Sequence, residues 1–385
     1  MKRNFYFIFL LVIGITTSTN THATIRRVKF TATTTPVPGI DFTTFQDAHD
    51  AASNGDTIQL YPNTLTYNSF TGTINKKLVI IGPGYNYNSY YVSGSEIPNS
   101  GLQILPGYIN NNTFTIAKGS AGTSIQGVNN VYIYTSNIPD SLNDISIIRC
   151  KDVSVYWDNS GVCNNWIISQ CYNVSTSQTT YGASYTGNRT ISNLRIENCI
   201  TANNGSQISV NTSPVGISSG QILNCTFYGP YFNFYNQAFV VQNCIIVGGL
   251  YYYSSGMANT IFINNITESA VLNNIMFTNP GSAGNVFGVS FTNNAFFVGY
   301  PNNTSGSVTL YSNDARYVLS ATSPAKNAGI IPGTATATDC GAFGGTNPYK
   351  VSGMPSVPSF YKLTSPSSTA TSSPYTLTFS VKSNN

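Results

Sequence analysis

The chain has 385 residues, of which 41% are hydrophobic and 13% aromatic, so it has ample material for a core and does not resemble a disordered chain. Only 8% of its residues are charged, against roughly 25% in an average soluble domain. Its net charge of +4 comes without a dense Lys/Arg cluster, which excludes a nucleic-acid footprint and predicts no nucleic-acid partner.

The N-terminus predicts a signal peptide over residues 1–23. Lys2 and Arg3 precede an apolar run over residues 5–15, which is too short to span a bilayer. Small polar residues follow, and we place cleavage after Ala23. The alternative is an uncleaved membrane anchor. No later segment approaches 18 apolar residues, so we expect a mature chain without a transmembrane span, secreted to the extracellular space or outer cell surface, with the periplasm as the alternative.

Loss of the signal peptide would leave few groups for catalysis. Basic residues fall from 17 to 15, against 13 acidic residues, and His49 becomes the one histidine. A multi-histidine zinc site is therefore excluded. We expect His49 at the rim of the fold or half-buried rather than in an active site.

A short helix is predicted next, because Phe45, Ala48 and Ala52 share one helical face. Asn54-Gly55-Asp56 then supplies a helix stop and a turn. The first strand is expected to begin directly after this turn.

A short phrase then recurs through the middle of the chain: apolar and polar residues, a polar-Cys or Asn-Asn pair, and β-branched or aromatic residues. The copies end at Asn130, Cys150, Cys171, Cys199, Cys225, Cys244, Asn274 and Asn294. Short strands at this loose period, with few two-residue hairpin signals, are typical of a solenoid whose strands pair in parallel about 4.8 Å apart. The sequence therefore predicts an all-β parallel β-helix with a short N-terminal capping helix.

In such a solenoid, equivalent residues form columns along the axis. We predict a structural ladder made of Cys150, Cys171, Cys199, Cys225, Cys244, Asn274 and Asn294. Buried cysteine packs as a small hydrophobic residue, and asparagine tolerates left-handed turns. Disulfides are the alternative, since export permits them. Cys163 and Cys340 fall outside this register, and their state is left open.

The last 40 residues change in composition. Proline, serine and threonine dominate residues 346–385, which predicts an extended tail that ends in a strand over residues 375–382. We therefore divide the chain into a signal peptide (1–23), a β-helix domain (24–345) and this tail.

Two segments resemble secreted bacterial right-handed parallel β-helix proteins with the pectin-lyase-like fold, in the pectate lyase superfamily. One is the helix-turn-strand segment from Phe42 to Pro62, and the other is the closing phrase around Ser323–Gly329 and Asp339–Gly345. The resemblance implies a right-handed β-helix. It implies little about function, because the fold carries lyases, hydrolases, epimerases and non-catalytic adhesins.

Lyases of this family hold Ca²⁺ with several carboxylates and use an Arg or Lys as base. In this chain the matching candidates are Lys151 or Arg195 as base, with Asp152 and Glu197 as Ca²⁺ ligands. The alternative is scattered surface charge, in which case we predict no metal and no cofactor. Carboxylates do not occur in the close pairs that hydrolysis requires.

Tyrosine clusters predict a second kind of site. Tyr85, Tyr87, Tyr251 and Tyr253 are candidate glycan contacts, because phenol rings combine an apolar face with a polar tip. The sequence thus favours a non-catalytic extracellular or cell-surface module, structural or glycan-binding, with a polysaccharide or glycan partner. An atypical Ca²⁺-assisted uronate polysaccharide lyase and a self-assembling structural subunit are the alternatives, and the oligomeric state is left open.

Overall fold

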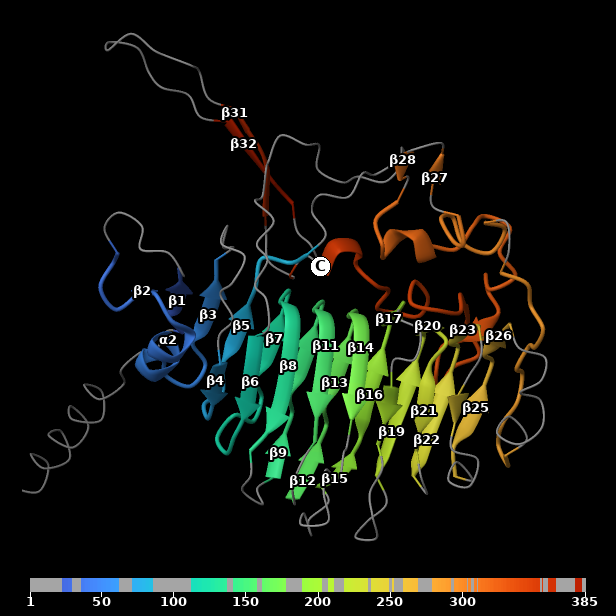
Figure 1. The fold of residues 1–385 in the computed structure, drawn as a ribbon, viewed down its shortest axis with the longest axis horizontal. Coiled ribbons are helices and arrows are strands. Elements are labelled where there is room, and N and C mark those ends of the chain that lie inside the picture. The colour runs from blue at the N-terminus through green and yellow to red at the C-terminus, as the bar shows by residue number, and fades with distance from the viewer. Residues whose placement is uncertain are drawn as a thin grey trace, which may run out of the picture.

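Each coil of the chain pairs its strands in parallel with those of the next coil. In the computed structural model, Ile147 pairs with Ile125 on one side and with Ile168 on the other. The fold is a right-handed parallel β-helix, as the sequence predicts, and its coils succeed one another along one axis (Figure 1). The structure describes residues 23–29, 36–61, 71–85, 112–136, 141–157, 161–177, 189–202, 207–210, 218–234, 237–248, 251–252, 259–268, 279–291, 294–302, 304–305, 308–309, 311–353, 355, 359–364 and 378–382.

Two long sheets and one short sheet make up the solenoid (Figure 1). Sheet A contains, in spatial order, β2 (Asp41–Phe42), β1 (Ile25–Val28), β3 (Thr57–Leu60), β5 (Val79–Ile81), β7 (Ser124–Gln126), β10 (Ser146–Ile148), β13 (Ile167–Ser169), β16 (Leu194–Glu197), β19 (Ser219–Leu223), β22 (Ala238–Gln242) and β25 (Ile261–Ile263). Sheet B contains β4 (Thr71–Ile74), β6 (Asn112–Ile116), β8 (Asn129–Thr135), β11 (Lys151–Tyr156), β14 (Tyr172–Ser177), β17 (Ile200–Thr201), β20 (Thr226–Tyr228), β23 (Ile245–Val247) and β26 (Ile266–Thr267). A branch of sheet B contains β18 (Gln207–Ser209), β21 (Tyr231–Asn233) and β24 (Tyr251–Tyr252), and sheet C contains β9 (Ser141–Asn143), β12 (Gly161–Asn164) and β15 (Arg189–Ser192).

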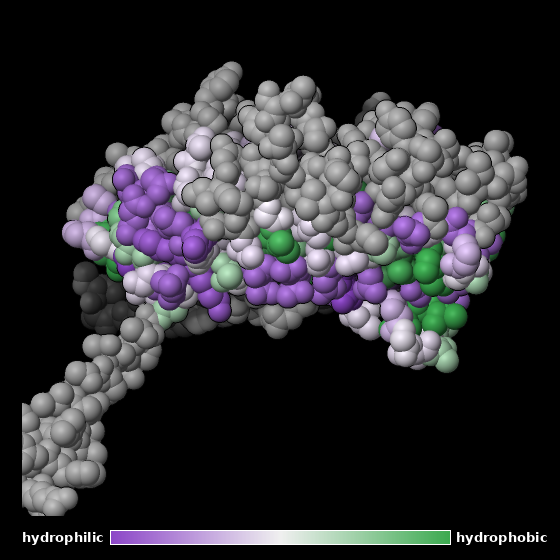
Figure 2. Space-filling view, turned by 90° about the horizontal axis from the view of Figure 1, so that it is seen from below, coloured by the Kyte–Doolittle hydropathy of each residue, from purple (hydrophilic) through white to green (hydrophobic). Residues whose placement is uncertain are grey.

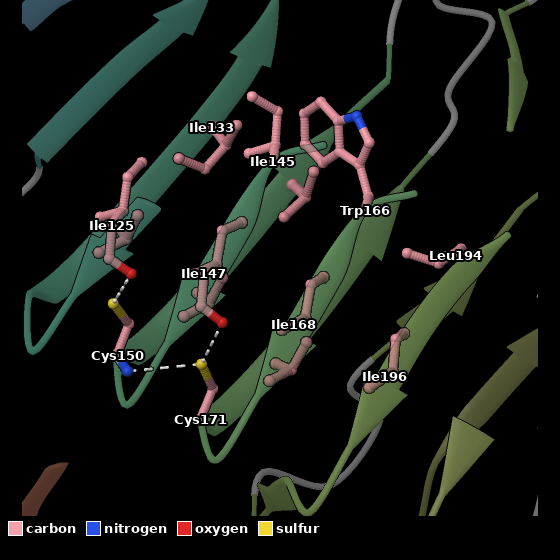
Figure 3. Packing of buried hydrophobic residues seen from close by; sticks show 14 of the residues in the cluster. Ile125, Ile133, Ile145, Ile147, Cys150, Trp166, Ile168, Cys171, Leu194 and Ile196 are labelled. Carbon is pink, nitrogen blue, oxygen red and sulfur yellow. Dashed lines mark hydrogen bonds between the residues drawn. The ribbon is translucent and has the colours of Figure 1, made fainter. Parts of the chain in front are cut away.

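Side chains alternate between the core and the outside along these strands, and the inward ones stack from coil to coil. Strand β8 alternates buried and partly exposed residues over its full length. Figure 3 shows Ile125, Ile147, Ile168 and Ile196 in one such inward row, and all four are buried. Because like residues repeat at the inter-strand spacing, the core is a set of continuous apolar columns.

The open N-terminal end is covered by the predicted helix, α2 (Phe45–Ala51), with Thr44 as its N-cap. Phe45, Ala48 and Ala52 are buried in the core, as their spacing predicts. Strand β1 was not expected from the sequence. It precedes the helix and pairs in parallel with both β2 and β3, so residues directly after Ala23 add a strand to sheet A between β2 and β3.

From β7 to β25, a residue with left-handed backbone conformation follows each strand of sheet A and turns the chain into sheet B. Positive φ angles occur at this position in Arg149, Gln170, Asn198, Asn224, Asn243 and Asn264. The next residue points inward, and there the structure places Cys150, Cys171, Cys199, Cys225 and Cys244, all buried and free. The Cys150 backbone N–H donates to the Cys171 Sγ atom, and each thiol donates to carbonyl oxygens (Figure 3).

Asparagine continues this column, although at other positions than the sequence suggested. Asn265 accepts from the Cys244 backbone N–H at 2.9 Å, and Asn285 accepts from the Asn265 N–H at 3.0 Å. At the other end Val128, and not Asn130, is equivalent to Cys150, because Lys151 pairs with Asn129. Asn274 lies outside the described residues. The placement of Asn294 in the ladder is wrong, because its side chain bonds to the backbone of Asn302 in a loop.

Other amide ladders line the exposed turn between sheets C and A. The Nδ2 atom of Asn193 donates to Asn165 at 2.8 Å, and that of Asn165 donates to Asp144 at 2.9 Å. Figure 2, which looks from the side of β9, β12 and β15, shows a hydrophilic band along the solenoid. Neutral amides can stack in this way without the repulsion that like charges would suffer.

After the last coil the chain runs back along the solenoid as a strap, defined here as residues 323–353. Its backbone accepts hydrogen bonds from the left-handed turn residues Asn243, Asn224, Asn198 and Gln170, in that order as the strap proceeds. Residues 346–353, which the sequence assigned to the tail, continue the strap, and Tyr349 is buried. Beyond the strap, β31 (Ser359–Thr364) and β32 (Thr378–Lys382) pair with each other as an antiparallel hairpin.

Short elements complete the C-terminal part: two hairpins, β27 (Thr304–Ser305) with β28 (Val308–Thr309) and β29 (Gly329–Ile330) with β30 (Ala337–Thr338), and two 3₁₀ helices, η2 (Ala315–Tyr317) and η3 (Val351–Gly353). Residues of the segment 291–300, of η2 and of the strap form a second apolar cluster against the outer side of sheet B, including Tyr172, Ile200 and Ile245. Within the described ranges, no helix is long and apolar enough to cross a membrane.

Candidate functional site

The four residues suggested for lyase chemistry lie in two different sheets. Lys151 and Asp152 begin β11 in sheet B, whereas Arg195 and Glu197 belong to β16 in sheet A. Lys151 forms an ion pair with Asp152, with 3.8 Å between the Lys151 Nζ atom and a carboxylate oxygen. Arg195 forms another with Glu197, with 2.5 Å between the Arg195 Nε atom and a carboxylate oxygen. In the part of the chain that the structure describes, no three His, Cys, Asp or Glu residues gather closely enough to hold a metal ion.

The contacts of the Glu197 and Asp152 carboxylates indicate that both have a structural role. Glu197 is 9% exposed, and its second oxygen accepts a hydrogen bond from Ser169 on the neighbouring strand. The strap residue Asn347 donates to the same serine hydroxyl. Asp152 adopts a positive φ of 50° and accepts from the Asn173 amide at 2.8 Å. These carboxylates therefore stabilise a strand surface and a turn, and they do not converge on a shared ligand position.

His49 is more deeply placed than the sequence suggested, at 1% exposure on the inner face of α2. Its Nδ1 atom lies 2.9 Å from an Asp50 oxygen, and its Nε2 atom accepts from the Asn75 backbone N–H at 3.4 Å. The expectation of a rim or half-buried position is therefore wrong. The imidazole joins the capping helix to the turn after β4.

Tyr85 does not bind at the surface, because it is 4% exposed. Its hydroxyl lies 2.6 Å from that of Tyr349, which in turn donates to the fully buried Asp314 at 3.0 Å. Burial raises the pKa of both phenols well above their ordinary range, so both stay neutral. The proposal of Tyr85 as a glycan contact is therefore wrong, and this residue belongs to a buried polar chain.

The other tyrosine candidates are only partly placed. Tyr251 lies in β24, which pairs with β21. Tyr87 and Tyr253 fall outside the described residues. The role of Tyr87, Tyr251 and Tyr253 as glycan contacts stays a prediction.

The structure reveals a different group of tyrosines on the outer face of sheet B. Tyr132 and Tyr134 alternate with buried residues along β8, and Tyr156 ends β11. We call these three residues the tyrosine platform. Tyr134 and Tyr156 are register partners, and their rings stack with centroids 4.8 Å apart and planes 12° apart. All three side chains are partly exposed.

Small hydroxyl residues surround the platform. Thr113 and Thr115 of β6 are the register partners of Tyr132 and Tyr134, and Ser154 of β11 lies on the other side of Tyr132. Ser175 of β14 follows Ser154 in the same row. The register partner of Tyr134 on β6 is therefore a small hydroxyl residue and not another phenol.

The charge near the platform is balanced. Lys151 and Asp152 form a mutual pair at the start of β11. Asn173 adds an amide at the same edge, bonded to Asp152. The surroundings therefore offer hydroxyls, amides and ring surface, and little net charge to attract an acidic ligand.

The chain itself limits the platform on the side of the later coils. There Tyr300 stacks on Tyr317 with centroids 5.6 Å apart, and the Arg316 guanidinium lies over both rings. Burial raises the pKa of Tyr317, which lies in the second apolar cluster. The outer face of sheet B thus divides into a section covered by the C-terminal segments, which begins with Tyr172 of β14, and a section over β6, β8 and β11 that carries the platform.

Sequence reasoning missed the platform because it looked for runs of consecutive tyrosines. The available signal was alternation: Tyr132-Ile133-Tyr134 places two rings on one face, and Tyr156 recurs 22 residues after Tyr134. That interval matches one coil, so the same face was predictable once the register was known.

Comparisons with known proteins add a distant likeness. No family model and no curated protein matches the chain. Among solved structures, the crystal structure of pectate lyase Pel9A is similar at 15% sequence identity with a TM-score of 0.37, over 85% of this chain and 98% of that one. At this identity and score, the likeness assigns neither activity nor site residues to this chain, and the β-helix assignment rests on the strand pairing.

Proposed function

We propose that this protein is an exported, non-catalytic β-helix module that binds neutral glycans at the tyrosine platform. The observation that carries this proposal is the partly exposed Tyr134–Tyr156 stack on the outer face of sheet B, beside rows of threonine and serine. The platform is part of a stacked sheet, so its geometry is held by the neighbouring coils.

The chemistry of the platform suits a sugar. A pyranose has apolar C–H faces and a rim of hydroxyls, and tyrosine offers an apolar ring with a polar tip. The Thr113, Thr115 and Ser154 hydroxyls can both donate and accept hydrogen bonds. Because Lys151 is paired with Asp152, the site favours a neutral glycan over a polyuronate.

The placement of the charged residues supports binding without turnover. Arg195 and Glu197 belong to sheet A, away from the platform strands, and Glu197 is occupied by Arg195 and Ser169. Asp152 is held by Lys151 and Asn173. A β-elimination would need a free base and carboxylates that converge on a metal, and these pairings favour binding alone.

The test is a glycan array that carries neutral and uronate oligosaccharides, probed with the native chain and with the Tyr134→Ala/Tyr156→Ala double variant. We expect binding to neutral glycans that the double variant loses. Gln221→Ala is the matched control, because Gln221 is exposed on the outer face of sheet A. Equal signals from the double variant and the native chain would overturn the proposal.

The two alternatives give other results with the same protein. A polysaccharide lyase would release an unsaturated product from polyuronate in the presence of Ca²⁺, detected by ultraviolet absorbance, and Arg195→Ala would abolish it. A self-assembling structural subunit would form ordered polymers in sedimentation experiments and give no array signal. We expect neither product release nor ordered polymers.

A further inference from the structure

The residue directly after the proposed cleavage position is bound to a buried carboxylate. The backbone nitrogen of Thr24 donates to the Asp56 Oδ1 atom at 2.8 Å. Asp56 is 3% exposed, while Ala23 and Thr24 are exposed. The Thr24 carbonyl oxygen in turn accepts from the Thr57 N–H at 2.9 Å. Both backbone groups of Thr24 are therefore held by the turn and strand that follow α2.

Asp56 is organised to hold positive charge at this position. Its Oδ2 atom accepts from the Ser53 backbone N–H at 2.9 Å and pairs with the Arg26 Nη2 atom at 3.2 Å. The same guanidinium is also held by a hydrogen bond from the Arg26 Nη1 atom to the Gly39 carbonyl oxygen. Oδ1 is thus left for the Thr24 nitrogen, which is a neutral amide as long as Ala23 is attached.

We propose that removal of residues 1–23 creates a docked N-terminus, in which the new Thr24 α-ammonium forms an ion pair with Asp56 and locks β1 onto sheet A. Hydrolysis of the Ala23–Thr24 peptide bond by a signal peptidase consumes one water and leaves a carboxylate on Ala23 and an amine on Thr24. The amine is protonated at neutral pH. A hydrogen bond between two charged partners is stronger than one from a neutral amide.

The geometry makes the site specific to one residue. A chain that begins at Ala23 would carry its ammonium about 3.8 Å along the backbone, beyond the 2.8 Å contact at Oδ1. Thr24 would then donate only as an amide. The inference rests on the export step of the proposed function and not on glycan binding, so either one can fail without the other.

The first experiment identifies the N-terminus of the full chain after export from a bacterial host, by mass spectrometry of the intact mature protein. We expect Thr24 as the first residue. A mature chain that begins elsewhere, or one that keeps residues 1–23, would overturn the inference.

The second experiment compares melting temperatures of chains that begin at Thr24, at Ala23, or at Thr24 with an acetylated amine. We expect the free Thr24 chain to melt about 3 °C above the other two. Asp56→Asn should remove or reverse this difference, because Arg26 and the ammonium would then face each other without the carboxylate. Equal melting temperatures for the free and acetylated Thr24 chains would contradict the ion pair, whether or not Asp56→Asn folds.

Discussion

Tyr85 and Tyr349 share a hydrogen bond of 2.6 Å between their hydroxyl oxygens although 264 positions separate them in the chain. Tyr85 follows an early strand of sheet A, and Tyr349 lies in the strap that returns from the far end of the solenoid. Asp314 completes this buried chain by accepting from Tyr349. The solenoid is therefore tied along its length by its own C-terminal segment, and not only by contacts between neighbouring coils.

Removal of the Tyr349 hydroxyl should weaken this tie. Tyr349→Phe leaves the buried Asp314 and Tyr85 each without one partner, which should cost about 1–3 kcal/mol of unfolding free energy. Urea denaturation monitored by fluorescence measures this loss of unfolding free energy. Tyr132→Phe, on the outer face of sheet B, should change stability far less. If both variants unfold like the native chain, the buried polar chain contributes no stability.

The strap should also depend on the turn residues beneath it. The Asn198 Nδ2 atom donates to Ala342 at 2.9 Å and to Gly344 at 2.7 Å. Asn198→Gly keeps the left-handed turn, with its φ of 51°, and removes both bonds. We expect a loss of about 1–2 kcal/mol and faster proteolysis within the strap.

Asn193→Gly is the control for this experiment. It makes the same substitution in an exposed left-handed turn, where the side chain bonds only to Asn165 among the described contacts. Equal strap proteolysis in both variants would show that Asn198 does not hold the strap.

The cysteines should be inert thiols. All seven are buried and free, and burial raises the pKa of Cys171 and Cys225 well above the ordinary value. Burial would also raise the pKa of Cys199, but hydrogen bonds from Cys171 and Cys225 outweigh it and lower this pKa to about 5. Reagent access therefore decides the outcome, because the Cys199 side chain is fully buried and a reactive thiol must also be accessible. A thiol reagent should label none of them in the native protein and all seven in denaturant. Rapid labelling of the native chain, or fewer than seven groups after unfolding without reductant, would contradict this state.

Acid should weaken the N-terminal end through Asp56. Burial by itself would raise its pKa, but hydrogen bonds from Ser53 and Thr24 and the charge of Arg26 outweigh it and hold the pKa below the ordinary 3.8. Because the folded pKa is the lower one, the carboxylate contributes stability above pH 3.8, and this contribution is lost as the pH falls toward the folded value. The difference in unfolding free energy between the native chain and Asp56→Asn should therefore be constant at neutral pH and shrink below about pH 4. If the difference in unfolding free energy between the two proteins grows on acidification, the stabilising role of the ionised Asp56 carboxylate is contradicted.

Local features of the sequence were enough to predict the coil architecture. The phrase before Cys150, Cys171 and Cys199 combines an inward apolar residue, a left-handed turn and a small buried side chain, and these are local requirements that each coil must meet. Asn-Asn pairs misled the alignment because asparagine is common throughout the chain. The 21-residue step from Cys244 to Asn265 follows the period better than the 30-residue step to Asn274.

The long-range contacts between the strap and the coils could not be predicted from local sequence features. No periodicity links Asn198 to Gly344, which lie 146 positions apart, because the strap crosses the coils instead of repeating with them. The burial of Tyr85 follows from this strap, so an apparently exposed loop tyrosine became part of the core. The platform, by contrast, needed only the strand register and the alternation of β8.

The most direct test of the proposed function is calorimetric titration of a neutral oligosaccharide that the array selects. The native chain, Tyr134→Phe, Tyr134→Ala and Gln221→Ala are titrated with the same sugar. We predict that Tyr134→Ala raises Kd by about tenfold or more, equivalent to about 1.4 kcal/mol, while Tyr134→Phe keeps most of the affinity through its ring and Gln221→Ala keeps all of it. A Kd for Tyr134→Ala equal to that of the native chain would contradict glycan binding at the tyrosine platform.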